Sequence, residues 1–138
     1  MAQYLGCQEA DVFAAVGGIA GPNRGGCNPS RPLSVVYMHG TEDSTVGYSG
    51  ARSTVTGWAM RNGCSTTPVE TYNMGSTRCE TYSGCRESGE VVFCTHTGMG
   101  HCWPEDSRCG PGGGPDFAIT DFKASPFMWE FFKRHPLP

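Results

Sequence analysis

Charged residues are scarce in this sequence and include no basic run. Asp, Glu, Lys and Arg together make up 17% of the 138 residues, and the formal net charge is -3. The Lys and Arg residues are scattered and are not interleaved with aromatic residues, so the sequence offers no track for nucleic-acid phosphates. Long apolar runs are also missing. We therefore expect neither a nucleic-acid partner nor a membrane partner.

Glycine, proline and cysteine are abundant by contrast. The 20 Gly and 10 Pro residues indicate a loop-rich globular chain, whose length fits a single domain over residues 1–138. The eight cysteines show no repeated C-x-x-C, which favours disulfides over a structural zinc site and indicates an oxidising compartment. The N-terminus nevertheless lacks the basic start and cleavable apolar segment of a signal peptide. A natural N-terminus upstream of Met1 would reconcile these two observations.

The hydrophobic pattern alternates helical and extended segments. A helix within 1–10 is followed by an apolar strand at 12–21, and the near-continuous apolar run at 33–40 is typical of a strand buried on both faces. A helical pattern over 53–64 stops at Asn62-Gly63, a signal for a helix C-terminus. The segments 69–75 and 78–85 are candidate strands or a hairpin, and 90–96 is a further strand.

The last helix is expected to have Ser125 as its N-cap and Pro126 in its first position. Its apolar face consists of Phe127, Met128, Phe131 and Phe132. Taken together, the segments predict an α/β fold with a small, mostly parallel sheet and flanking helices. In such a sheet, functional loops follow the carboxyl ends of the strands.

Two of these loops carry residues of a catalytic type. His101 stands in GMGHCWPE, after the strand at 90–96, on a glycine-rich loop where an enzyme would place a general base. Asp43 stands in the polar loop HGTEDSTVGYSG, which follows the strand at 33–40. From the residues alone, capping a turn or a helix is the commoner role for Asp43, and a loop histidine is more often structural.

A series of motifs resembles a known enzyme family. In chain order it reads ADVFAAVGGIAG, HGTEDSTVGY, GWAMRNGC, YSGC, GMGHCWP and FMWEFF. This series resembles the secreted esterases that include polyhydroxybutyrate depolymerases, feruloyl esterases and acetylxylan esterases, which are α/β-hydrolases. The resemblance covers nearly the whole chain. It implies an incomplete α/β-hydrolase fold, namely the carboxyl-terminal half that follows the nucleophile elbow, in a secreted or periplasmic protein.

The resemblance also implies residue roles. In that family a serine attacks an ester carbonyl, a histidine takes the serine proton, and an aspartate orients the histidine. His101 matches this histidine and Asp43 matches this aspartate, so we expect their side chains within hydrogen-bonding reach. Trp103 matches a tryptophan beside the scissile bond. Tyr48 and Trp103 form either a platform for a carbohydrate or aromatic ester, or a shield over the end of the sheet.

The implied substrate is a small ester, a polyester or a plant cell-wall ester, and we expect no cofactor and no metal. The nucleophile of the family, however, has no match here. GYSG at 47–50 has the wrong spacing for G-x-S-x-G, and YSG at 82–84 lacks the first glycine. The segment MAQYL resembles the helix after the elbow, which would place the serine before Met1. Two alternatives stay open: a non-catalytic binding or interaction module derived from such an esterase, or a small esterase that uses Ser44 or Ser49.

The family pattern further implies four disulfides. It pairs Cys64 with Cys85 and Cys102 with Cys109, which leaves the pairs Cys7–Cys27 and Cys79–Cys94. A zinc site made of Cys94, His96, His101 and Cys102 is an alternative use of this region. His39, at a strand end, is expected to pack or hydrogen-bond rather than to bind a metal.

The strand at 12–21 also predicts association. In the complete family fold it is flanked by the strand that leads into the elbow. Here Val12, Phe13, Val16 and Ile19 would line an apolar edge without Lys, Pro or an inward charge to protect it. We therefore expect a homodimer or higher oligomer joined at or beside this strand.

Overall fold

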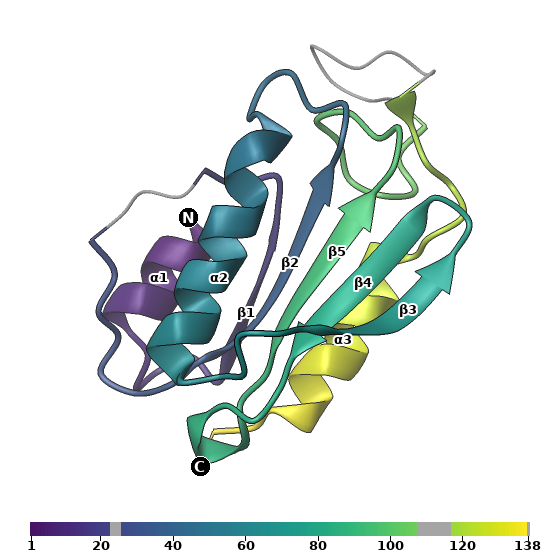
Figure 1. Ribbon diagram of the computed structural model, residues 1–138. Coiled ribbons are helices and arrows are strands. Elements are labelled where there is room, and N and C mark those ends of the chain that lie inside the picture. Colours follow the sequence, from purple (N-terminus) through teal and green to yellow (C-terminus); the bar gives the residue numbers. More distant parts are fainter. Residues whose placement is uncertain (23–25, 108–116, 138) are drawn as a thin grey trace.

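A computed structural model describes residues 1–22, 26–107 and 117–137, and a five-stranded sheet forms its centre in the order β1-β2-β5-β4-β3 (Figure 1). The strands are β1 (Ala15–Ile19), β2 (Ser34–Gly40), β3 (Val69–Met74), β4 (Thr77–Tyr82) and β5 (Val91–His96). Helices α1 (Ala2–Gln8) and α2 (Ala51–Asn62) cover one face, and α3 (Ala124–Arg134) covers the other. Two 3-10 turns, η1 (Tyr48–Gly50) and η2 (Arg86–Ser88), precede α2 and β5. The fold therefore belongs to the predicted α/β class.

The strand directions correct the expectation of a mostly parallel sheet. The pairs β1–β2 and β2–β5 are parallel, whereas β5–β4 and β4–β3 are antiparallel. The candidate hairpin is confirmed, and its turn contains Gly75 at φ +58°, a conformation that glycine adopts without strain. A hairpin reverses the chain directly, so its strands run antiparallel. Side-chain pattern reports which residues are buried but not which way a strand runs, and the sheet is mixed.

Strand β2 lies at the centre of the parallel part, and every residue in it is buried. Its side chains alternate between two cores. Val35 and Tyr37 pack with the helices α1 and α2, whereas Val36 and Met38 pack with α3. The continuous apolar run that predicted burial on both faces is thereby explained.

The ends of the helices agree with the sequence in one case and differ in the other. Helix α2 ends at Asn62 and is capped by Gly63 in the left-handed conformation, as predicted. Helix α3 begins two residues earlier than expected, with Lys123 rather than Ser125 at its N-cap. The first residue of the helix, Ala124, is fully buried, and its packing extends the helix toward the N-terminus. Pro126 still lies in the first turn, where a backbone N–H has no helical partner to lose.

The expected strand at 12–21 is shorter in the structure. Val12 and Phe13 precede β1, and their backbone N–H groups donate to the carbonyl oxygen of Glu9, both at 3.0 Å. These two bonds hold the residues in a turn, which excludes them from the sheet.

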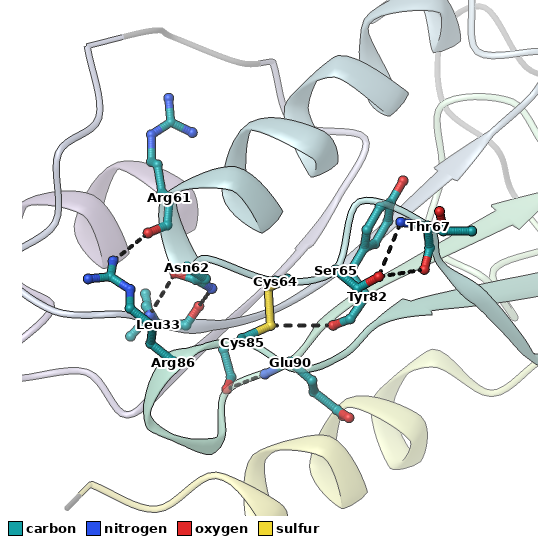
Figure 2. The surroundings of a disulfide bond; sticks show 11 residues. Leu33, Arg61, Asn62, Cys64, Ser65, Thr67, Tyr82, Cys85, Arg86 and Glu90 are labelled. Atoms are coloured by element: carbon teal, nitrogen blue, oxygen red, sulfur yellow. Dashed lines mark hydrogen bonds between the residues drawn. A yellow bond between two sulfur atoms is a disulfide. The ribbon is translucent and has the colours of Figure 1, made fainter.

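A polar clamp and a disulfide attach the end of α2 to the sheet (Figure 2). The buried Asn62 side chain accepts a hydrogen bond from the Leu33 amide at 3.1 Å and donates one to the Leu33 carbonyl at 2.7 Å. One residue beyond Gly63, Cys64 is bonded to Cys85. The helix is thereby fixed to the residue before β2 and to the segment after β4.

Three of the four expected disulfides are present, namely Cys7–Cys27, Cys64–Cys85 and Cys79–Cys94. The fourth involves Cys109, which lies outside the described residues. The three bridges support an extracellular or otherwise oxidising compartment.

Candidate functional site

The candidate site lies where β2 and β5 end side by side. The two strands are parallel neighbours, with Gly40 paired to His96 at their carboxyl ends. The loop with Asp43 leaves β2 and the loop with His101 leaves β5, so both loops emerge from the same end of the sheet (Figure 1). This is the edge where parallel sheets place functional residues.

Close backbone contacts hold the two loops together. The Glu42 amide donates to the Met99 carbonyl at 3.0 Å, and the Gly98 amide donates to Thr41 Oγ1 at 2.9 Å. A Cβ atom on Gly40 would lie 2.1 Å from the Met99 carbonyl oxygen, so only glycine lets the second loop pass this close. The end of β2 and the loop before His101 thus form one packed unit.

This unit brings Asp43 and His101 together. The distance from Nδ1 of His101 to Oδ2 of Asp43 is 2.9 Å, and the predicted contact is confirmed. The Asp43 side chain is fully buried, whereas 35% of the His101 side chain is exposed. If Nδ1 donates to the carboxylate, a neutral His101 presents the lone pair of Nε2 for proton transfer. The arrangement suits a general base with an orienting carboxylate.

The loop also fixes the second oxygen of Asp43. Oδ1 accepts hydrogen bonds from the Thr45 amide at 2.9 Å and from the Val46 amide at 2.8 Å. Burial alone would raise the pKa of Asp43. The hydrogen bonds from the Val46 amide, His101 and the Thr45 amide outweigh burial and lower that pKa below its usual value. The carboxylate is therefore ionised and held in a fixed orientation. The alternative role of Asp43, capping a turn, is present in the same geometry and is compatible with the contact to His101.

Sequence reasoning did not find one member of this cluster. His39, the penultimate residue of β2, has Nε2 3.2 Å from Oδ2 of Asp43. It also hydrogen-bonds Tyr37 and Val46, which confirms the expectation that it packs and bonds. Its place four residues before Asp43, at the end of a buried strand, is the signal that could have revealed it.

The two aromatic candidates differ in environment. Tyr48 is half-buried, its hydroxyl is 2.9 Å from Thr95 Oγ1, and its ring stacks on Phe93. Trp103 is 46% exposed. Tyr48 therefore packs against β5, and Trp103 is the more accessible ring beside His101.

The alternative zinc site is excluded by the disulfides. The sulfur of Cys94 is bonded to Cys79 and cannot act as a thiolate ligand. Within the described ranges, no group of three or more His, Cys, Asp or Glu side chains is arranged to hold a metal ion.

A hollow of the described structure lies away from these residues. It has a volume of about 750 Å³ and is bordered by α1, β1 and α2, with Gln3, Tyr4, Gly18 and Trp58 among its lining residues. Neither Asp43 nor His101 lines it, so this hollow does not mark the candidate site. As for membranes, none of the helices in the described part of the chain has the length and apolar character required to cross one.

Comparison with known proteins finds a relative among the esterases. The chain is similar to feruloyl esterase B of Piromyces equi, with 30% identity over 159 aligned residues that include all of this chain and 26% of that protein. The similarity supports a relationship to esterases. The chain spans about a quarter of the length of this relative, and no protein-family model matches the sequence.

Proposed function

We propose that this chain supplies the acid–base histidine and the orienting aspartate of a secreted serine carboxylic-ester hydrolase. The observation that carries the proposal is the 2.9 Å contact between Asp43 and His101 at the shared end of β2 and β5. Its support from outside the structure is the similarity to a feruloyl esterase over the whole chain. In this proposal the described sheet is the carboxyl-terminal half of an α/β-hydrolase fold.

The proposed reaction is acyl transfer through a serine. Nε2 of His101 takes the hydroxyl proton while the serine oxygen bonds to the ester carbonyl carbon, and His101 then gives the proton to the departing alcohol. In the second half, His101 takes a proton from water, the water oxygen bonds to the acyl carbon, and the serine is released with the proton. Asp43 keeps Nδ1 protonated and stabilises the positive charge that His101 gains in each half.

The serine itself belongs to a part of the enzyme outside this sequence. None of the serines of the 138 residues stands in G-x-S-x-G. Helix α1 would then be the helix that follows the elbow. The proposed substrate is a small ester, a polyester or a plant cell-wall ester. Trp103 would lie beside its scissile bond.

The missing motif also favours a second candidate, a non-catalytic binding module that keeps the scaffold of an esterase. A fluorophosphonate probe, which labels activated serines, distinguishes the two. The gene upstream of Met1 is read for an in-frame G-x-S-x-G, and the longer product and the 138-residue chain are each incubated with the probe. We expect one label on the longer product by intact mass and none on the shorter chain.

Variants of the longer product then test the roles of the two residues. Asp43→Asn and His101→Gln should each slow labelling by roughly 10³-fold to 10⁴-fold, because the serine loses its base or the base loses its correct tautomer. His135→Gln, a histidine substitution at the end of α3, is the matched control and should label at the normal rate. If the upstream gene lacks the motif and the 138-residue chain is not labelled, the non-catalytic binding module is the remaining candidate. Labelling of the 138-residue chain at Ser44 or Ser49 would show that another serine serves as nucleophile.

A further inference from the structure

His39 is a buried histidine whose surroundings determine its protons. Its exposed fraction is 1%, and it lies at the end of β2 under the loop that carries Asp43. The titratable groups that face it are Tyr37 from its own strand, Asp43, Tyr48 from η1 and His96 from β5. Three of these groups are hydroxyl or imidazole groups, and Asp43 is the one carboxylate among them.

The Nε2 atom of His39 must carry a proton. It lies 2.7 Å from the Val46 carbonyl oxygen and 3.2 Å from Oδ2 of Asp43. Both of these oxygens can only accept a hydrogen bond. A lone pair on Nε2 would face two electron-rich atoms, so Nε2–H donates to Val46 and its positive edge faces Asp43.

The Nδ1 atom must carry a proton as well. Its partner is the Tyr37 hydroxyl at 3.0 Å, and this hydroxyl is also 2.6 Å from the Gly21 carbonyl oxygen. Burial, reinforced by the charge of Asp43, raises the pKa of Tyr37 to about 12, so the hydroxyl keeps its single proton. The Gly21 carbonyl can only accept, so that proton points at Gly21. Tyr37 therefore accepts from Nδ1–H of His39.

We propose that His39 is held as an imidazolium and is a positioning residue that fixes the Asp43 carboxylate for His101. Oδ2 of Asp43 then lies between two imidazole rings, with His101 Nδ1 at 2.9 Å and His39 Nε2 at 3.2 Å. The buried cation stabilises the ionised carboxylate and limits its rotation. A fixed carboxylate keeps the His101 ring in the orientation that acyl transfer requires. This consequence for catalysis rests on the proposed function, whereas the protonation of His39 does not.

Nitrogen-15 NMR of the imidazole rings tests the protonation directly on the 138-residue chain. At about pH 7.5 an ordinary histidine is mostly neutral. We expect both ring nitrogens of His39 to carry protons at this pH. In Tyr37→Phe the acceptor for Nδ1–H is gone, and His39 should keep only the Nε2 proton. A single ring proton on His39 in the unaltered chain would overturn the proposal.

The effect on Asp43 is tested with His39→Gln, whose amide nitrogen keeps a donor for Val46 but carries no charge. We expect the low-field NMR signal of the proton between His101 and Asp43 to shift in this variant, while the amide spectrum of the sheet stays unchanged. An unshifted signal would show that His39 only fills space. If His39→Gln does not fold, the Tyr37→Phe comparison decides the protonation by itself.

The two proposals fail in different experiments. In the longer product, His39→Gln should slow fluorophosphonate labelling, because the Asp43 carboxylate is no longer fixed for His101. A longer product that never labels contradicts the proposed function while the NMR result for His39 stands.

Discussion

The fold strongly lowers the pKa of His96. This histidine is fully buried at the end of β5, where Thr77 Oγ1 lies 2.8 Å from Nδ1, and among the described residues Nε2 has no hydrogen-bond partner. Burial lowers the pKa of His96 to about 4, although Asp121 opposes the shift, and the charge of His39 adds to it. The folded protein therefore holds this ring neutral well below the pH at which an exposed histidine gains a proton.

This shift predicts loss of stability in mild acid. The unfolded chain binds a proton at His96 below about pH 6.5, whereas the folded chain binds it only near pH 4, so the stabilisation is complete above this window and is lost as the pH falls through it. This pKa shift corresponds to a loss of about 3 kcal/mol in the free energy of unfolding. Urea unfolding between these pH values should show a falling free energy of unfolding. His96→Gln should remove the part of this fall that His96 causes.

His135→Gln is the matched control and should leave the decline in place. Asp43, whose pKa is lowered, adds a separate loss below about pH 4, where its carboxylate gains a proton. An equal pH dependence in the unaltered chain and His96→Gln would contradict the burial argument.

At the scale of single residues, the sequence was sufficient for Asp43 and His101 but not for His39. The first two follow strands that could be recognised from their apolar runs, and the resemblance named their types. The role of His39 depends on the Tyr37 hydroxyl and on the Gly21 carbonyl beyond β1. Those contacts arise from the register between β1 and β2, which no local pattern encodes.

Helix α2 depends on a single polar side chain for its attachment to the sheet. Asn62→Ala would leave the amide and carbonyl of Leu33 buried without their partners, which costs about 1 to 3 kcal/mol for each group. We expect the midpoint of urea unfolding to fall accordingly. Met60→Ala, on the exposed side of the same helix, is the control and should change stability by less than about 0.5 kcal/mol.

The two loops of the site depend on Gly40 in a similar way. A methyl group there would collide with the Met99 carbonyl, so Gly40→Ala should push the loop with His101 away from β2. We expect loss of the NMR signal of the proton between His101 and Asp43, with the hairpin signals of β3 and β4 unchanged. If the signal persists, the loop can adapt to the methyl group while the contact between His101 and Asp43 stays intact.

Elements were more predictable from sequence than their directions. The buried runs of β2 and β5, the Asn-Gly stop of α2 and the hairpin could be recognised because burial and turn chemistry are local properties. The even split between parallel and antiparallel pairs could not, since a strand has the same side-chain period in either direction. The N-cap of α3 was misplaced because burial of Ala124 outweighed the local preference of Ser125.

At the scale of the whole molecule, β1 is an edge strand, as its predicted role in association requires. The apolar surface beside it differs from the expectation, because Val16 is buried against α1 whereas Val12 is 58% exposed and Phe13 is 38% exposed. Tyr4 of α1 is 60% exposed as well. The homodimer remains a proposal, with the exposed residues of α1 and the turn before β1 as its contact surface.

Sedimentation of the 138-residue chain tests this proposal. We expect a mass of at least twice 14.8 kDa at high concentration, and a shift toward the monomer in Val12→Lys, which places a charge on the contact surface. Met60→Lys, a similar change on the exposed side of α2, should have no effect. A monomer at every concentration would mean that this edge needs no partner.

The disulfides Cys64–Cys85 and Cys79–Cys94 enclose overlapping stretches of the chain, since Cys79 lies inside the first loop and Cys85 inside the second. Trypsin could cut after Arg78 and after Arg86, both of which are exposed. The short piece between the cuts would keep one half of each bridge, so all three pieces would remain one covalent species until a reductant is added. The middle of the sheet would therefore stay covalently joined after cuts in its own backbone, for as long as the two bridges stay oxidised.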